Sequence, residues 1–498
     1  MRATRPLRWL ATLPLLCGLG CATVPDTEGW IEVRTEAFEL VSRLPEAETR
    51  ELADRLELFR RAVTRFTDIP PVPDEQRIRV YAFDEKGFFG RFIEAENAAG
   101  FYRPQMRGDV IALVSAYHLD AEEIIFHEYT HRLIHGTRRV VFPKWFDEGF
   151  AELMGAFELK NGSVRIGELT SRAMLGGWER WMPLSRIVDA SGFERMPADA
   201  QSMFYAQSWL MAHYMMFGPG EAEFSERMGQ FLALRETGLD ERTAFEQAFG
   251  EIDALETRLQ RYLRAQIRAI SIPTENFGDL PSPSVRRLSR AEAAEALGSL
   301  AITGGRPHYD LAQAYFEEAL AAAPDRPRSL CGLADLHKFR GDWKTSESLF
   351  ERAIELAPDD ALTQLDYGQY WYDLGIAQED PAQRAAMLER ARSHLVASYR
   401  LDPNLAETYA FYGMTYLHEG EDASKGVDTL AYASSLLPSN TSILFALGRA
   451  YRATGRTDEA DFLLRKVVTW SHDPGLAARA RELLEGGGAD APAPVGAP

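Results

Sequence analysis

The chain has 498 residues, of which 46% are hydrophobic and 26% charged, and its formal net charge is −19. The chain is longer than a domain with a single hydrophobic core usually is, so we expect about two or three domains. The balance of apolar and charged residues excludes an intrinsically disordered protein. The acidic charge argues against nucleic acid or an anionic lipid surface as the main binding partner.

Residues 1–21 have the pattern of a secretory signal. Three arginines precede an apolar run over residues 9–19, which is too short to span a membrane comfortably. The run ends in GLGC, which resembles a bacterial lipoprotein signal in its Gly20, although Gly18 stands where leucine is usual. This resemblance implies lipidation at Cys21 and a membrane-anchored protein on the periplasmic or extracellular side. An ordinary cleaved signal, which would leave the protein periplasmic or secreted, is the alternative.

No later segment is apolar for long enough to be a transmembrane helix, so we expect contact with the membrane through the lipid anchor only.

Four elements are predicted between the signal and residue 115. Residues 30–42 are rich in β-prone residues with some alternation, which predicts strands. An amphipathic helix is predicted over 46–67, and the prolines that follow it end it. The apolar runs 77–83 and 109–115 are further strand candidates.

The sequence FHEYTHRLIHG at residues 126–136 carries a possible metal site on a helix predicted over 121–135. His127 and His131 share a helix face because they are four residues apart. Two neutral imidazoles suit Zn²⁺, and Glu128 is placed to reach a water at such an ion.

A catalytic zinc site needs a third protein ligand, and two patterns compete for it. One pattern, HExxHxxGxxH, places a histidine beyond a glycine, but Ile134 and Thr137 occupy these two positions here. His135 lies one turn further along the same helix and cannot bend back to the ion, so it is predicted to be a surface residue or a support for a ligand. The other pattern takes a glutamate from a second helix.

The second pattern has its counterpart in PKWFDEGFAELM at residues 143–154. HEYTH followed by a DEG glutamate resembles the gluzincins, a group of zinc peptidases. Together with YAQSW at 205–209, the motifs are similar to those of a family of largely uncharacterised bacterial predicted peptidases. The resemblance implies an α+β zincin-like metallopeptidase domain over 27–270, with Glu148 as the third zinc ligand.

Glu152 follows Glu148 by four residues and so shares its helix face. Metal-bound imidazoles usually donate their second nitrogen to a carboxylate, which makes Glu152 a candidate partner for His127 or His131. A solvated charge on the helix is the alternative for Glu152.

Peptide hydrolysis also needs a donor to the oxyanion of the tetrahedral intermediate. The resemblance favours Tyr205, near the start of an amphipathic helix over 203–216, with His213 and Tyr214 as competing candidates. An aromatic residue on an apolar helix is often part of the core, which is the other possibility for Tyr205. The family further implies that the strand 109–115 is an edge strand that binds extended substrate.

The rest of the N-terminal domain, 186–270, is predicted to be largely helical. The Pro- and Ser-rich segment 271–289 is predicted to be an interdomain linker.

Beyond residue 290 the chain repeats. AQAYFEEALAAAP ends at Pro324, and SESLFERAIELAP ends at Pro358, 34 residues later. The pattern resembles tetratricopeptide repeats, whose paired helices bury their apolar faces by stacking into a superhelix. We expect about five repeats and a capping helix over 290–485, and a low-complexity, disordered tail over 486–498.

The leading hypothesis is an exported zinc metallopeptidase that hydrolyses peptide bonds, with repeats that bind a protein partner or substrate. In it, His127, His131 and Glu148 hold Zn²⁺, Glu128 is the general base, and Tyr205 stabilises the oxyanion. One alternative is a non-catalytic repeat scaffold with an idle peptidase-like domain. Another is a zinc hydrolase that acts on a bond other than a peptide.

Overall fold

The computed structural model describes most of the chain from residue 27 to residue 486. The described residues are 27–67, 77–94, 98–114, 118–135, 141–170, 178–190, 193, 196–265, 267, 269–471 and 473–486. The predicted signal with Cys21 and all but the first residue of the predicted tail lie outside these ranges. Within them, no helix combines the length and the apolar character needed to cross a membrane.

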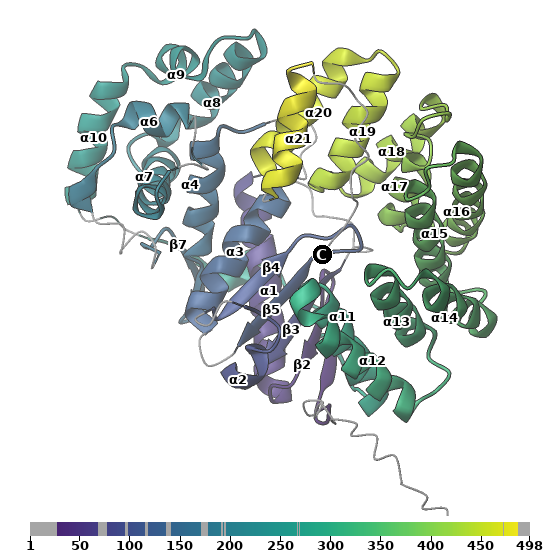
Figure 1. Cartoon of the computed structure of the whole chain (residues 1–498). Coiled ribbons are helices and arrows are strands. Elements are labelled where there is room, and N and C mark those ends of the chain that lie inside the picture. Colours follow the sequence, from purple (N-terminus) through teal and green to yellow (C-terminus); the bar gives the residue numbers. More distant parts are fainter. Residues whose placement is uncertain are drawn as a thin grey trace, which may run out of the picture.

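A six-stranded mixed sheet lies at the centre of the N-terminal part, with the strand order β4-β5-β3-β2-β1-β9 (Figure 1). Its strands are β1 (Ile31–Arg34), β2 (Phe38–Ser42), β3 (Ile78–Phe83), β4 (Gly100–Arg103), β5 (Val110–Val114) and β9 (Ser284–Arg287). Strands β2, β3 and β5 run parallel, whereas β1, β4 and β9 are antiparallel to their neighbours.

The two faces of this sheet enter two different cores because successive side chains of a strand point to opposite faces. In β3, Ile78 and Val80 pack in a core with α1 (Glu46–Thr67) and α3 (His118–His135). Tyr81 and Phe83 of the same strand pack in another core with α11 (Arg290–Ile302) and α12 (Tyr309–Ala322). One face of the sheet is therefore covered by α3, the metal-motif helix, which carries His127 and His131. The other face is covered by α11 and α12, the first helix pair of the repeats.

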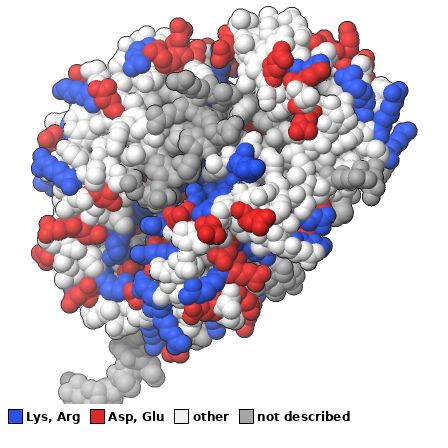
Figure 2. Space-filling view, turned by 180° about the vertical axis from the view of Figure 1, so that it is seen from behind, with Lys and Arg blue, Asp and Glu red and all other residues white. Residues whose placement is uncertain are grey.

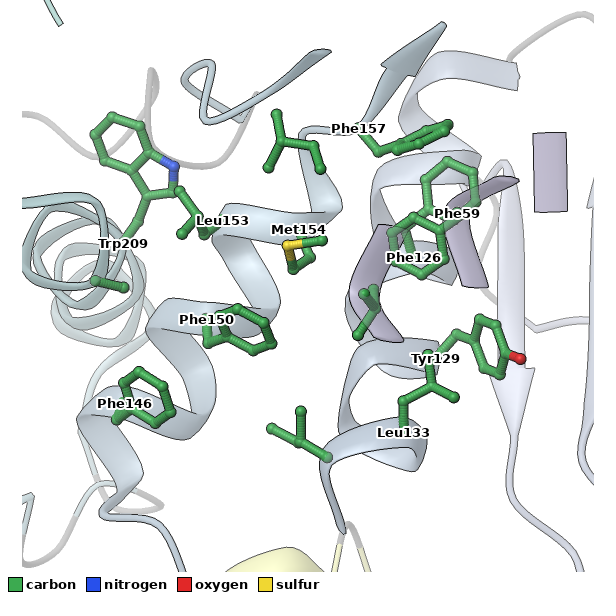
Figure 3. Close-up of a cluster of buried hydrophobic side chains, with 14 of the residues drawn as sticks. Phe59, Phe126, Tyr129, Leu133, Phe146, Phe150, Leu153, Met154, Phe157 and Trp209 are labelled. Atoms are coloured by element: carbon green, nitrogen blue, oxygen red, sulfur yellow. The ribbon is translucent and has the colours of Figure 1, made fainter. Parts of the chain in front are cut away.

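Helix α3 packs beside α4 (Lys144–Gly155) around an aromatic cluster (Figure 3). Phe126 stacks on Phe59 of α1 at 4.2 Å between ring centroids, and Phe157 meets the Phe126 ring edge-on at 5.2 Å. The residues labelled in Figure 3 are Phe59, Phe126, Tyr129, Leu133, Phe146, Phe150, Leu153, Met154, Phe157 and Trp209. This packing fixes α3 and α4 against each other, so the polar residues between them are held in place.

The remaining elements of the N-terminal part are mostly helices, in agreement with the helical prediction for 186–270. These elements are α2 (Lys86–Phe89), β6 (Glu158–Lys160), β7 (Ser163–Ile166), η2 (Trp178–Arg180), α6 (Leu184–Asp189), α7 (Ala198–Phe217), α8 (Glu221–Glu236), α9 (Glu241–Phe249), α10 (Ile252–Arg264), β8 (Ile270–Pro273) and η4 (Thr274–Phe277). Strands β6, β7 and β8 form a second, three-stranded sheet.

The structure corrects the expected edge strand. The predicted strand 109–115 corresponds to β5, which lies inside the sheet between β4 and β3. The edge is β4, which is antiparallel to β5 and was not predicted. Strand β4 has only four residues, of which Gly100 and Arg103 weaken the apolar pattern, so its sequence carries little strand signal.

The segment 271–289 also differs from the expected linker. Strand β8 extends into it and pairs with β7, and β9 adds to the large sheet beside β1. Arg286 of β9 donates to both carboxylate oxygens of Glu32 at 2.7 and 2.8 Å. Of the prolines and serines that indicated a flexible linker, Ser271, Pro273 and Ser284 lie within the two strands, and Ser289 caps α11.

Between residues 290 and 486, the described residues form five helix pairs and a final helix. They comprise α11 with α12, α13 (Pro327–Phe339) with α14 (Trp343–Leu356), α15 (Ala361–Ile376) with α16 (Pro381–Leu401), α17 (Ala406–Met414) with α18 (Ser424–Leu436), α19 (Thr441–Ala453) with α20 (Thr457–Trp470), and α21 (Pro474–Leu484). The array curves from the sheet, where α11 and α12 lie, round to the metal-motif helix α3, near which α20 and α21 lie (Figure 1).

Opposite charges lie close together on the surface. On the face seen from behind, Lys and Arg side chains gather with Asp and Glu side chains in the lower half, and neither sign covers the face alone (Figure 2). Much of this charge is paired within the structure, as in the ion pairs of Glu39 with Arg34 and Arg79. This face therefore offers no continuous positive surface among the described residues.

Candidate metal centre

The imidazoles of His127 and His131 meet on the buried face of α3. Their Nε2 atoms are 3.2 Å apart, and both side chains are almost fully buried. The spacing of four residues brings them together because it corresponds to about one helical turn.

Glu148 of α4 completes a triangle with the two histidines. Its Oε2 atom lies 3.2 Å from Nε2 of His127 and 3.3 Å from Nε2 of His131. In a tetrahedral zinc site with bonds of about 2.1 Å, two ligand atoms are about 3.4 Å apart. The three atoms therefore have the mutual distances that one zinc ion requires.

Two buried atoms of the site support this fit. Oε2 of Glu148 and Nδ1 of His127 make no well-aligned hydrogen bond within the described part of the chain, although imidazole or carboxylate atoms lie 3.2–3.3 Å from them. A buried carboxylate oxygen without a well-aligned donor is costly, and a cation between it and the imidazoles would remove that cost. The residues present therefore suit a divalent metal that accepts two nitrogens and one oxygen.

The charged side chains of the site shift one another's pKa values. Burial opposes ionisation of Glu148, but Lys144 and the imidazole of His131 outweigh it and hold the pKa of Glu148 well below its usual range. Burial also opposes protonation of His127, but Glu148 and Glu152 outweigh it and raise the pKa of His127 to about 9. A metal ion would have to replace these protons, because metal-bound imidazoles are neutral.

Each residue of the triangle has a second partner. Nζ of Lys144 lies 2.7 Å from Oε1 of Glu148, one turn apart on α4. Oε1 of Glu152 lies 3.3 Å from Nδ1 of His127, and its other oxygen accepts a hydrogen bond from Thr170 at 2.9 Å. The partner role predicted for Glu152 is thus compatible with its position beside His127.

Asp147 performs the corresponding role for His131. Its Oδ1 atom lies 3.3 Å from Nδ1 of His131 and 2.7 Å from Nε2 of His135. Burial opposes ionisation of Asp147, but the two imidazoles outweigh it and lower its pKa. The three side chains are close enough to hold a metal themselves. However, His131 presents Nδ1 to Asp147 and Nε2 to the triangle, which is the arrangement of a supported ligand.

His135 is not part of the triangle, as the sequence predicted, but it is not a surface residue. It is 5% exposed, and its ring stacks on that of Trp470 in the last repeat, with 4.2 Å between centroids and 7° between planes. Sequence analysis could not find this contact because the two residues lie 335 positions apart.

Glu128 is the residue after His127 on α3, and its charge acts on the edge strand β4. It is half-buried and is one of the negative charges that, after burial and Asp109, raise the pKa of Tyr102 in β4. Asp109 accepts hydrogen bonds from Tyr102 and from Arg132 of α3. This network ties the β4–β5 hairpin to α3, the helix that also carries Glu128 and the two histidines.

Tyr205 also lies near the triangle. Its ring meets that of His127 edge-on at 6.1 Å and that of Phe193 at 5.6 Å. The two competing candidates lie elsewhere. Nδ1 of His213 is 2.9 Å from the hydroxyl of Tyr262 on α10, and the ring of Tyr214 packs against the same tyrosine. The structure therefore brings Tyr205 to the site and places His213 and Tyr214 in a separate aromatic cluster.

The close approach of α7 explains why the residue after Glu148, Gly149, is a glycine. A Cβ atom at this position would lie 2.2 Å from the carbonyl oxygen of Ser208 on α7. The absence of a side chain lets α4 and α7 approach closely, and Tyr205 lies on the same face of α7 one turn earlier.

The roles of Lys144 and Asp147 beside the triangle were not predicted from the sequence, although both residues lie in the motif PKWFDEGFAELM. The spacing of four residues between Lys144 and Glu148 was a usable signal, because such pairs share a helix face. Asp147 had no such signal, because its contacts depend on how α3 and α4 cross.

The matches to protein-family models fall within the repeats. Two family models described as Tetratricopeptide repeat match the chain, one over residues 329–362 and the other over residues 441–473. These segments contain most of α13 with α14, and α19 with α20. The C-terminal part of the chain therefore consists of tetratricopeptide repeats, which form a helical scaffold for protein interaction.

Among curated proteins, the chain is similar to cellulose synthase operon protein C of Xanthomonas axonopodis pv. citri (strain 306), with 26% identity over 361 residues. The match covers 65% of this chain but only 22% of that protein, so the chain spans about a fifth of the length of this relative.

Solved structures similar to the chain include a thermophilic TPR protein of Thermus thermophilus, with 26% identity and a TM-score of 0.35. That match covers 39% of this chain and 99% of the other. The TPR protein YrrB, which has an unusual peptide-binding site, is 18% identical with a TM-score of 0.28, over 38% of this chain and 89% of the other.

Proposed function

We propose that the chain is a zinc-dependent metallopeptidase of the gluzincin type whose repeats bind protein. The observation that supports this is the triangle of His127, His131 and Glu148, with ligand-to-ligand distances of 3.2–3.3 Å. Zinc bound there would lower the pKa of a water and polarise a carbonyl group.

Residues of the chain would carry out proton transfer, stabilisation of the oxyanion and binding of the peptide. Glu128 accepts the proton of the attacking water and passes it to the leaving amine, a role favoured by its place directly after His127 and by its electrostatic effect on Tyr102 of β4. Tyr205, beside His127, donates a hydrogen bond to the oxyanion. As the strand at one edge of the sheet, β4 would add an extended peptide by strand pairing.

The tetratricopeptide repeats favour a second function, a non-catalytic scaffold in which the N-terminal part is idle. Two family models match within this part of the chain. The same scaffold serves the first proposal, in which the repeats bring a protein substrate or partner to the site. A zinc hydrolase of a non-peptide bond would use the same ligands and base.

Metal analysis of the purified protein separates these functions. We expect one equivalent of zinc in the wild type and none in His127→Ala. A peptide-library digest should show cleavage that a chelator abolishes. Glu128→Gln should keep the zinc and lose about a hundredfold or more in kcat, as expected for a general base.

Three results would contradict parts of this proposal. A wild-type protein without stoichiometric metal would support the scaffold, whereas unchanged hydrolysis in metal-loaded Glu128→Gln would show only that Glu128 is not the base. A metal-loaded protein that cleaves esters or cell-wall amides but no peptide supports the third function.

We further propose export with lipidation of Cys21, which would place the site on the periplasmic or extracellular side. Metabolic labelling with a fatty-acid analogue tests this, and Cys21→Ser should abolish the label.

A further inference from the structure

We propose that Trp470, in the last repeat, is a positioning residue of the metal centre, acting on the zinc ligand His131 through His135 and Asp147. This inference rests on the proposed zinc site. It assigns to the repeat array a role in metal binding, in addition to any partner that the array binds.

The contacts form an uninterrupted path between the two parts of the chain. The indole of Trp470 lies parallel to the imidazole of His135, with 4.2 Å between ring centroids. Nε2 of His135 is 2.7 Å from Oδ1 of Asp147, and the same oxygen is 3.3 Å from Nδ1 of His131. All four side chains are at most 5% exposed.

Stacking fixes the plane of the His135 ring. A flat contact with 7° between the planes leaves the imidazole little freedom to rotate about its χ2 angle. With the plane fixed, Nε2 keeps its direction towards Asp147. A carboxylate held in this way orients the imidazole of His131, whose other nitrogen faces the triangle.

Trp470 is itself held by its neighbours. Lys466, one turn earlier on α20, is 2% exposed, and its ammonium lies 4.7 Å from the centroid of the indole ring. The indole N–H of Trp470 has no hydrogen-bond partner among the described residues, so packing and stacking hold the ring.

Two further sets of contacts fix the repeat array against the N-terminal part. They also help to keep α20 beside α3. Arg107, in the loop between β4 and β5, forms ion pairs with Asp366 of α15 and Glu407 of α17 at 2.5 and 2.8 Å. The first repeat shares a core with the sheet, where Tyr315 stacks on Phe92 at 6.0 Å. The position of Trp470 is therefore determined by the whole array.

Zinc affinity, measured by competition with a chromogenic chelator on the full chain, tests the proposal. Trp470→Leu keeps apolar volume but removes the flat ring, and we expect it to weaken zinc binding about fivefold to tenfold. Trp470→Phe, which can still stack, should stay within about twofold of the wild type. Trp343→Leu is the matched control, because this tryptophan packs against Tyr370 inside the array.

A double-mutant cycle with His135→Ala decides whether the effect follows the proposed path. In that background Trp470→Leu should have no further effect on zinc affinity, because the link is already broken. An equal loss in both backgrounds, or an unchanged affinity in Trp470→Leu, would overturn the proposal. A wild type that binds no zinc would instead overturn the proposed function and this inference together.

Discussion

Glu148 has a different neighbour on each carboxylate oxygen. Oε1 contacts the ammonium of Lys144, and Oε2 faces the two imidazoles. Lys144 therefore supplies positive charge to a buried carboxylate even without a metal, although the same charge repels an incoming cation.

Replacing Lys144 tests this balance. Lys144→Met should destabilise the metal-free protein by about 1–3 kcal/mol, because Glu148 loses its ion pair. Zinc should restore more stability in this variant than in the wild type, since the ion replaces the lost charge. Thermal unfolding with and without zinc measures both effects.

Lys160→Met is a suitable control for Lys144→Met, because Lys160 is exposed and its ion pair with Glu158, at 3.4 Å, lies on the surface. A weaker stabilisation by zinc in Lys144→Met than in the wild type would show that Lys144 orients Glu148 rather than competing with the ion.

Lys466 predicts a pH dependence of stability. Burial lowers its pKa from 10.5 to about 8, so between these values the unfolded chain binds more protons than the folded protein. Stability should therefore rise with pH over this window, by about 1–3 kcal/mol relative to Lys466→Met. Urea unfolding between pH 8 and 10.5, with chelator present, measures the difference, and the exposed Lys344→Met should follow the wild type. Parallel pH curves for wild type and Lys466→Met would contradict the burial effect.

At this scale the sequence predicted His127, His131 and Glu148 as a set, and the structure places them together. The histidines follow from helical spacing alone, whereas Glu148 needed the resemblance to a family. Asp147 and the burial of His135 could not be predicted, because both depend on the crossing of α3 with α4 and on Trp470 of a distant repeat.

Among the elements, α4 and α7 depend on one glycine for their close approach. Gly149→Ala would place a methyl group against the backbone of Ser208, so α7 would have to move away. We expect a loss of about 2–4 kcal/mol in unfolding free energy and weaker zinc binding, because Glu148 is the adjacent residue.

Gly229→Ala provides the matched control for Gly149→Ala. A Cβ at Gly229 in α8 would meet nothing within 4 Å, so this variant should be neutral or more stable by about 0.5–1 kcal/mol. Equal stabilities of the two variants in denaturant unfolding would contradict the proposed close contact.

The elements show where prediction from sequence works. Helices α1 and α3 and the repeats have long periodic patterns, and the structure has them at nearly the predicted positions. The short strands β4, β8 and β9 were missed because four residues with few apolar positions carry little signal. Their pairing is decided by distant partners, such as β1 for β9.

For the whole molecule, the central feature is the core shared by the sheet and the first repeat. Residues of both parts bury one another, including Tyr81 and Phe83 of β3 with Leu297 of α11 and Tyr315 of α12. A sequence pattern marks both segments as apolar but does not show that they belong to one core.

A truncated chain tests this dependence. The fragment 27–289 should aggregate or unfold non-cooperatively, because the face of the sheet with Tyr81 and Phe83 would be exposed. Co-expression with the fragment 290–486 should restore a soluble complex. A monodisperse fragment 27–289 that unfolds cooperatively in calorimetry would contradict the shared core.

The contacts at the two ends of the array also change how it should unfold. Stacked repeats usually fray from their ends, since a terminal repeat has one neighbour where an inner repeat has two. Here the first repeat has the sheet as an additional neighbour, and the last described pair has α3 through Trp470 and His135. Amide hydrogen exchange should therefore be slowed at both ends of the array, and the repeats should open together with the N-terminal part as one cooperative unit.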